Sequence, residues 1–278
     1  MLKFLVDKEK CVQCYACVND CPSRTIHRKG TLPEAAEDGC IECQHCLAVC
    51  PEGAISVFGL RPENSLPLLD DAIPAYRQMK ALARGRRSVR QFRDEDVPAA
   101  LIDELLADTA HAPTGRNARD LTFSVVPDRG AMGRLRERVI QAIEARLKSG
   151  EAFHEYIIGS VKAYREHGQD MLFRGAPHLL VVSPGEKAAC GLEDAVLALS
   201  YFELLAQSAG LGTTWCGMIK IVADMVPEIR GLLGLAPDSY FYAMMFGQPR
   251  VRYVRTVQRD SAARIRRLDI NGISSFVN

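Results

Sequence analysis

Eight cysteines between residues 11 and 50 constrain this chain more than any other feature of its sequence. They form two runs with the same spacing: two residues separate each of the first three cysteines, and three residues precede the fourth. A proline follows each fourth cysteine, and an isoleucine lies five residues after it. The runs are Cys11, Cys14, Cys17 and Cys21, then Cys40, Cys43, Cys46 and Cys50. The repeated pattern indicates an internal duplication.

This spacing is typical of bacterial iron–sulfur sites, in which the fourth cysteine of each run ligates the other cluster. Two-residue gaps let three thiolates converge on one cluster, and the proline ends the turn after the fourth cysteine. We therefore assign one [4Fe–4S] cluster to Cys11, Cys14, Cys17 and Cys50. The second [4Fe–4S] cluster is assigned to Cys40, Cys43, Cys46 and Cys21.

Two other uses of cysteine fit the pattern less well. A structural zinc site takes four ligands and would leave half of these thiols unused. A disulfide framework needs an oxidising compartment, and no signal-peptide pattern precedes Cys11. We expect a cytoplasmic protein for the same reasons.

Residues 1–60 resemble the bacterial dicluster ferredoxins, on the strength of these two cysteine runs. The resemblance implies a small ferredoxin-like (βαβ)2 module that carries single electrons. Strands over residues 2–6 and 54–58 would flank the cluster loops. Residues 61–78 contain Pro62, Pro67 and Pro74 with little periodicity, and we predict a linker there.

Residues 79–278 are long enough for a second domain with its own core. The net charge of +1 gives no reason to expect nucleic acid or a membrane surface as a partner. No apolar run approaches the roughly 18 residues of a membrane span. Apolar periodicity predicts helices over residues 98–111, 133–148, 151–168 and 194–209, after a short helix from Tyr76. Strands are expected over residues 121–126, 179–183 and 240–246.

The predicted helix over residues 194–209 is apolar on nearly every side, so we expect it inside a core or a subunit interface. An arginine-rich segment, RRSVRQF, begins at Arg86 and offers guanidinium groups and a hydroxyl suited to phosphate. The alternative is a solvated basic turn.

Four separated segments resemble the nitroreductase family in order and spacing. They are RRSVRQF from Arg86, APTGRN from Ala112, GLGTTWCG from Gly210, and FGQP from Phe246 with the arginines that follow. The resemblance covers about residues 80 to 260 and implies an α+β fold that binds FMN at the interface of a homodimer. It is greatest to family members that carry an N-terminal ferredoxin module.

Carried over by position, the resemblance implies contacts to FMN from four parts of the chain. Arg86, Arg87 and Ser88 would hold the phosphate and ribityl chain, and Arg90 would lie near the pyrimidine edge. Arg255 or Arg259 would return to the phosphate.

The remaining contacts would be made to the flavin ring. The residues that would reach the ring from the other subunit are Pro113, Thr114, Gly115 and Asn117. The residues that would pass along the ring, with a backbone N–H near the flavin N5, are Thr214, Trp215, Cys216 and Gly217. Where relatives often have Gln-Pro-Trp after the asparagine, this chain has Arg119-Asp120-Leu121, which indicates an altered substrate-side wall and an unusual or anionic substrate.

Side chains outside these motifs have simpler interpretations. His111 could donate a proton near the flavin, but a histidine at a helix end is more often a cap or a surface group. We interpret His178 and Cys190 as structural, and Trp215 as part of the core. No catalytic residue is assigned, because the flavin performs the chemistry.

The sequence thus predicts an iron–sulfur, FMN-dependent oxidoreductase of the nitroreductase type. Electrons from a ferredoxin or flavodoxin-type donor would pass singly through two clusters to FMN, which would reduce a nitroaromatic, a quinone or an activated alkene. The reverse direction of flow stays open. One alternative is an electron carrier that relays electrons between ferredoxin-type partners, and another is a family offshoot that uses its flavin for a different reaction.

Overall fold

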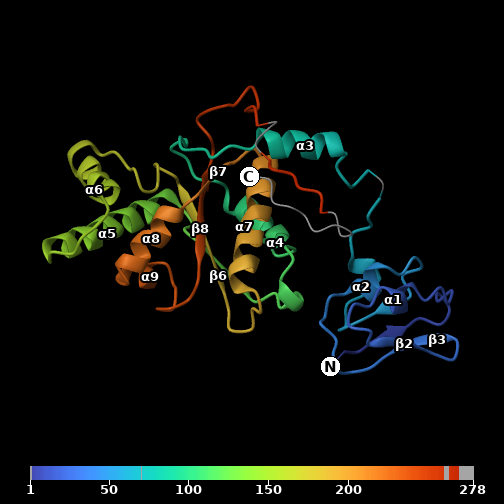
Figure 1. Cartoon of the computed structure of the whole chain (residues 1–278). Coiled ribbons are helices and arrows are strands. Elements are labelled where there is room, and N and C mark those ends of the chain that lie inside the picture. Colours follow the sequence, from blue (N-terminus) through green and yellow to red (C-terminus); the bar gives the residue numbers. More distant parts are fainter. Residues whose placement is uncertain (1, 70, 260–262, 269–278) are drawn as a thin grey trace.

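The computed structural model describes residues 2–69, 71–259 and 263–268. It contains a small cysteine-rich unit at the N-terminus and a larger unit built around one sheet (Figure 1). Among the described residues, no helix combines the length and the apolarity that crossing a membrane requires.

The N-terminal unit consists of two short antiparallel strand pairs and two single-turn helices. The strand pairs are β1 (Leu5–Val6) with β4 (Ile55–Ser56), and β2 (Ile26–Lys29) with β3 (Leu32–Ala35). The helices are α1 (Ala16–Asn19) and α2 (His45–Ala48). The strands predicted over residues 2–6 and 54–58 are therefore present but shorter than expected. Val57 and Leu47 are buried in the small core between these elements.

The duplication extends to the backbone conformation. Gln13 and Tyr15 adopt left-handed angles, with φ of 58° for both, between cysteines of the first run. Glu42 and Gln44, 29 residues later in each case, have φ of 56° and 61°. Left-handed angles are uncommon outside glycine. Their recurrence at matching positions shows that both cysteine loops are wound in the same way.

The connection between the units carries little secondary structure. It contains the short helix η1 (Pro62–Asn64) and leads into α3 (Tyr76–Gly85), which begins where the sequence predicted. Leu66 and Leu68 are almost fully exposed, so this segment packs on neither unit. The linker prediction agrees with this exposure, although its boundaries remain a prediction.

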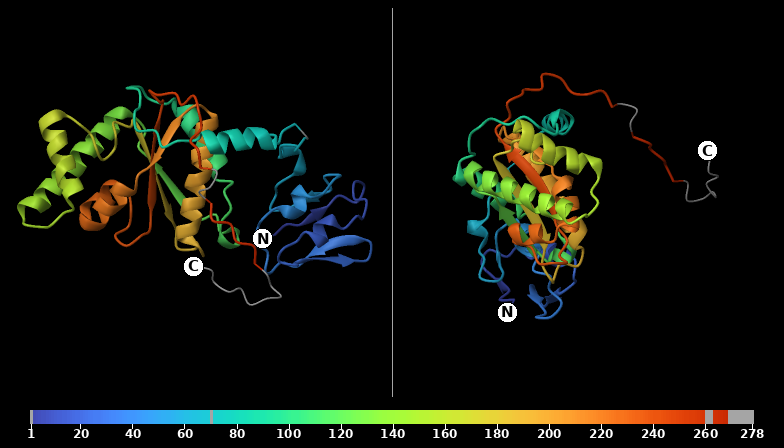
Figure 2. Two further views of the ribbon diagram at one scale, coloured as in Figure 1. Left: turned by 45° about the horizontal axis from the view of Figure 1, so that its top comes forward. Right: turned by 90° about the vertical axis from the view of Figure 1, so that its left-hand side faces the viewer.

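The larger unit is organised around a four-stranded antiparallel sheet in the order β5-β6-β8-β7. Its strands are β5 (Leu121–Val125), β6 (His178–Pro184), β7 (Gly212–Trp215) and β8 (Tyr242–Gly247). Helices cover both faces (Figure 2). They are α4 (Ala99–Thr109), α5 (Arg129–Lys148), α6 (Glu155–His167), α7 (Gly191–Ser208), α8 (Gly217–Met225) and α9 (Glu228–Leu232).

Alternation along the central strands divides the interior into two cores. Leu179 and Val181 of β6 point to the face covered by α5, α6, α8 and α9. Leu180 and Val182 point to the face covered by α4 and α7. Side chains of successive strand residues lie on opposite faces, so an apolar run of this length predicts a strand that is buried on both sides.

Three features of this unit differ from expectation. Helix α5 begins four residues earlier than predicted, because the Asp128 carboxylate caps it by accepting the N–H of Ala131 at 2.7 Å. Helices α8 and α9 were not predicted. Residues 213–215 form a strand beside β8, where the sequence indicated only a segment following the helix cap.

His178 joins three segments inside the sheet. Its Nε2 accepts the N–H of Val97 at 2.9 Å, and its Nδ1 lies 3.1 Å from the carbonyl oxygen of Val126. The ring stacks on Phe246 at 5.0 Å and is fully buried. These contacts confirm a structural role for this histidine. Burial lowers the pKa of His178 below its ordinary value of 6.5, and the Val126 carbonyl only partly opposes that shift.

We predict an acid-sensitive contribution to stability from this residue. A lowered folded-state pKa means that the unfolded chain binds the proton more readily. The contribution is therefore complete above about pH 6.5 and falls as the pH drops below it. His178→Phe keeps the stacked ring but leaves two buried backbone groups unpaired, at about 1–3 kcal/mol each.

Urea denaturation at pH 7.5 and at pH 5.5 measures both effects. The variant should be less stable than wild type at pH 7.5, and the difference should shrink at pH 5.5. A difference that grows toward low pH would contradict this assignment.

Candidate functional site

Two hollows in the N-terminal unit are each lined by four cysteines. Three cysteines of each hollow come from one run and the fourth comes from the other run, which is the grouping that the two cluster assignments require. The hollow of the first run is lined by Cys11, Cys14, Cys17 and Cys50. The hollow of the second run is lined by Cys40, Cys43, Cys46 and Cys21.

Backbone and hydroxyl groups support the crossing cysteines. Cys50 Sγ accepts the N–H of Ala54 at 3.2 Å, and Cys21 Sγ lies 3.4 Å from Thr25 Oγ1. Burial raises the pKa of Cys46 to about 11. Within the described part of the chain, no three His, Cys, Asp or Glu side chains converge closely enough to hold a single metal ion.

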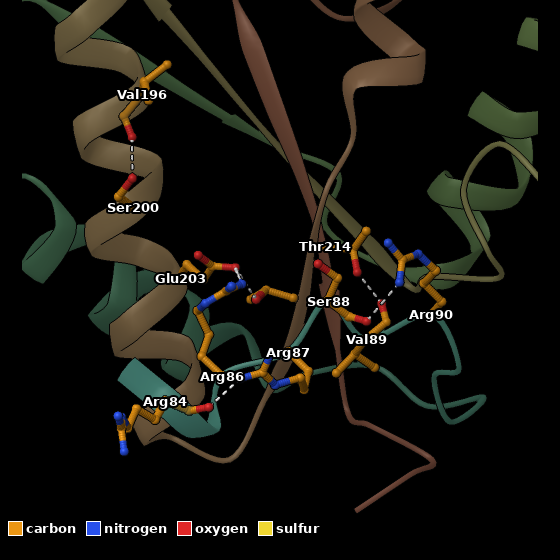
Figure 3. A network of polar contacts seen from close by, with 11 residues as sticks. Arg84, Arg86, Arg87, Ser88, Val89, Arg90, Val196, Ser200, Glu203 and Thr214 are labelled. Atoms are coloured by element: carbon orange, nitrogen blue, oxygen red, sulfur yellow. Dashed lines mark hydrogen bonds and ion pairs between the residues drawn. The ribbon is translucent and has the colours of Figure 1, made fainter. Parts of the chain in front are cut away.

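The arginine-rich segment runs alongside β7 (Figure 3). Ser88 bridges to Thr213 in parallel fashion, and Val89 donates its N–H to the Thr213 carbonyl at 2.8 Å. The approach requires glycine at position 212, since a Cβ there would lie 2.8 Å from the Val89 side chain. The Thr214 hydroxyl donates to the Val89 carbonyl and is occupied by that bond.

The two adjacent arginines of this segment have different surroundings. Arg86 donates from Nη1 to Glu203 Oε1 of α7 at 2.7 Å, and that carboxylate is buried. Arg87 donates from Nη2 to the carbonyl of Arg84, while its Nε is buried and has no hydrogen-bond partner among the described residues. A buried unpaired donor is costly. Arg87 is therefore the arginine with a donor available for a ligand, whereas Arg86 is held by an ion pair.

The loop between α4 and β5 is fixed at the opposite end of α7. Gly115 donates its N–H to Asp194 Oδ1 at 2.8 Å, and a Cβ at Gly115 would lie 2.8 Å from Cys190 Sγ. Arg116 and Asn117 adopt left-handed angles immediately afterwards. Cys190 itself is exposed, and its thiol packs against Gly115.

One protomer does not bring all the predicted FMN residues together. Ser88 and Arg87 lie near Glu203 in the second half of α7, whereas the 113–117 loop lies against Asp194 in its first turn. Nine residues of helix separate the two anchors, about 13 Å at 1.5 Å per residue. The predicted ligands thus form two groups within the chain.

The remaining predicted contacts are distributed as follows. Trp215 packs edge-on against Tyr242 at 5.5 Å, as expected for a core residue. Cys216 is buried, its N–H donates to the Ala243 carbonyl, and burial raises its pKa to about 12. Gly217 begins α8. The Cys216 N–H is therefore engaged within the sheet and is not free for a ligand.

The arginines after β8 have different surroundings. Arg255 and Arg259 are exposed, and their contact with the FMN phosphate stays a prediction. Arg250 and Arg252 line a hollow of about 480 Å³ together with Arg86. The strand bridge between Phe92 and Pro249 brings them there, and no periodicity in the tail could have indicated it.

A larger hollow of about 730 Å³ lies between the two units. The N-terminal unit contributes residues around the second cysteine run, including Cys43 and Gln44. The other side is formed by residues at the end of α4 and in the following loop, including the exposed His111. Helix α6 covers the other face of the sheet, so the 151–168 segment does not line this hollow.

Comparison with known proteins identifies both parts of the chain. Residues 83–248 match the Nitroreductase family, and residues 10–55 match the 4Fe-4S dicluster domain. A 4-nitrobenzoate reductase from Nocardioides sp. is 31% identical over 61% of this chain and 78% of its own length. An iodotyrosine deiodinase from Thermotoga neapolitana is 29% identical over 48% of this chain and 69% of its own.

Among solved structures, a nitroreductase with bound FMN from Bacteroides fragilis has the same fold. It aligns with a TM-score of 0.55 and 20% identity, covering 68% of this chain and 99% of its own. The family match spans more than half of the chain and includes the arginine-rich segment, the 113–117 loop and β7. The chain belongs to the Nitroreductase family and carries an N-terminal 4Fe-4S dicluster domain.

Proposed function

We propose that this protein is an FMN-dependent oxidoreductase that receives electrons through its own dicluster unit and reduces a small aromatic or similarly conjugated acceptor. The observation that carries the proposal is the hollow between the units, which borders both the second cysteine pocket and the 113–117 loop. A protein that only relays electrons would not need a hollow of this size, which falls within the usual range for small-molecule sites.

The cysteine pockets fit iron–sulfur clusters better than single ions. A zinc ion draws four sulfurs to one point at about 2.3 Å, whereas here four thiols surround a hollow. Thiolates are the usual ligands of such clusters. When bound, FMN would supply both one- and two-electron chemistry, and the two [4Fe–4S] clusters would carry single electrons.

Two features of the chain would suit the negative charge of FMN: the arginine-rich segment and the N-terminus of α8, which carries a partial positive charge. Arg87 Nε and the Ser88 hydroxyl would bind the phosphate, and Arg250 and Arg252 add positive charge beside Arg86. The first N–H groups of α8, beginning at Gly217, have no partners within the helix and favour negative charge near them. The 113–117 loop would close the site against water.

We further propose that the two groups of ligands meet across a homodimer. Helix α7 exposes an apolar stripe that includes Leu197 and Tyr201, which are 41% and 42% exposed. Val196 and Leu204 continue the stripe at helical spacing. A second copy seated on this stripe would bury it and could complete each site with a 113–117 loop.

The names of two relatives support a small aromatic acceptor. One relative is a 4-nitrobenzoate reductase and another an iodotyrosine deiodinase, and both names describe small aromatic substrates. The hollow between the units carries Arg119 and His111 at its lining, which would suit an acceptor with a carboxylate. A ferredoxin or flavodoxin-type protein is the proposed donor.

The cysteine assignments predict separable losses of iron. Cys21→Ser should remove a ligand from the second pocket, and Cys50→Ser one from the first, so each variant should retain about half of the iron. Cys190→Ser changes an exposed thiol outside both runs and should retain all of it. Iron and sulfide analysis with low-temperature electron paramagnetic resonance measures the outcome. Complete retention of iron in Cys21→Ser would contradict the crossed arrangement.

The anion site predicts a selective loss of flavin. Arg87→Ala combined with Ser88→Ala removes the guanidinium whose Nε lacks a partner and the neighbouring hydroxyl, so FMN should bind roughly 10- to 150-fold more weakly, as expected for lost hydrogen bonds to a charged group. Arg138→Ala is the control, since Arg138 is an exposed arginine on α5 that does not line the hollow of Arg86, Arg250 and Arg252. Fluorescence titration of the apoprotein with FMN gives the affinities. Equal affinity for FMN in the double variant and the control would contradict the role of Arg87 and Ser88 in binding the phosphate.

The apolar stripe predicts dimerisation through α7. Leu197→Glu with Tyr201→Glu should place charge in the interface and raise the dimer dissociation constant at least about 100-fold. Ile158→Glu changes a similarly exposed apolar residue on α6 and serves as the control. Analytical ultracentrifugation distinguishes the species, and a double variant that remains dimeric at nanomolar concentration would exclude this interface.

A further inference from the structure

The N-terminal unit contacts the rest of the protein through the second cysteine loop. Asn117 donates from Nδ2 to the carbonyl of Ile41 at 2.8 Å. Arg119 donates from Nη2 to Glu42 Oε2 at 3.2 Å. Ile41 and Glu42 lie between Cys40 and Cys43, so both contacts are made by the loop that lines the second cysteine pocket.

The backbone on both sides of these contacts is held in uncommon conformations. Glu42 has φ of 56° in the cysteine loop, and Asn117 and Arg119 have φ of 55° and 49° in the facing loop. Left-handed angles at residues other than glycine cost energy and persist where the surroundings hold them. Each side thus presents a fixed backbone shape to the other.

The two cysteine pockets differ in their relation to the larger unit. The second pocket shares Cys43 and Gln44 with the hollow between the units, whereas the first pocket shares no residue with it. Cys14 is exposed, while Cys43 at the matching position is partly buried. Val12 is 61% exposed, while Ile41 at the matching position is partly covered.

We propose that the two pockets have different roles, with the second pocket as the electron outlet docked on the 114–119 loop and the first as the inlet that meets the external donor. The assignment rests on the proposed function. When bound, the clusters would supply one-electron chemistry: the donor protein would lose one electron to the group held at the first pocket, and the flavin of the larger unit would gain one electron from the group held at the second. Asn117 and Arg119 act as positioning residues, since they hold the outlet in place.

The duplication provides a matched test of the docking contact. Glu42→Arg places a cation opposite Arg119, while Gln13→Arg introduces an arginine at the matching left-handed position of the exposed loop. The full-length, iron-loaded protein is studied without oxygen. Hydrogen–deuterium exchange should accelerate roughly three- to tenfold at residues 40–44 and 114–119 in Glu42→Arg, as expected for loss and reversal of an exposed ion pair. Gln13→Arg should match wild type at both segments.

A double variant with the two charges swapped completes the experiment. Glu42→Arg combined with Arg119→Glu should restore the wild-type rates of hydrogen–deuterium exchange. The iron content should be the same in all variants. On addition of a reduced ferredoxin-type donor, the iron–sulfur absorbance should bleach at an unchanged rate in Glu42→Arg. Flavin bleaching should be delayed in that variant and recover in the double variant.

Two results would overturn the assignment. One is a rate of hydrogen–deuterium exchange at residues 40–44 and 114–119 that is the same in Glu42→Arg as in wild type. The other is donor-dependent bleaching of iron–sulfur absorbance that slows in Glu42→Arg and not in Gln13→Arg, which would place the inlet at the second pocket. Protein that holds iron but no FMN would contradict the proposed function while leaving the exchange result interpretable.

Discussion

Two buried carboxylates on helix α7 determine how the larger unit presents its functional residues. Asp194, in the first turn, accepts the N–H of Gly115 and fixes the loop that reaches the N-terminal unit. Glu203, two and a half turns later, pairs with Arg86 and fixes the arginine-rich segment beside β7. Burying a carboxylate is costly unless it is paired, and each of these two has such a partner on one oxygen. The helix therefore acts as a rigid spacer between the two groups, and the distance between them is set by its length.

The same helix bears on the proposed dimer. Its inner side packs into the core through Ala198 and Phe202, and its outer side exposes Leu197 and Tyr201. An interior helix with an exposed apolar stripe is expected where a further layer of protein covers it. The division of the predicted FMN ligands into two groups and the exposed stripe have a common physical origin in the position of α7.

The sequence was most informative where local geometry and chemistry coincide. Fixed cysteine spacing predicted the crossed pockets, and apolar runs predicted β6 and α7, because these patterns depend only on residues near in sequence. The sequence was less informative where interacting residues are far apart along the chain. Nothing near Arg86 in the sequence indicates that Glu203 pairs with it, or that Arg87 Nε is left without a partner. The positions of Arg250 and Arg252 could not be predicted for the same reason, since the Phe92–Pro249 bridge brings them near Arg86. Helices α8 and α9 are short segments whose burial depends on the sheet beneath them.

The repeat of backbone conformation at an interval of 29 residues has an evolutionary consequence. Once two loops of equal shape exist, each can hold its own set of thiols, and selection is free to alter the outer residues of one loop without disturbing the other. Val12 and Ile41 occupy matching positions, yet one borders solvent and the other faces Asn117. A symmetric ancestor would have offered two equivalent faces to any partner. Fusion to a larger protein removes that equivalence, and the copies can then specialise.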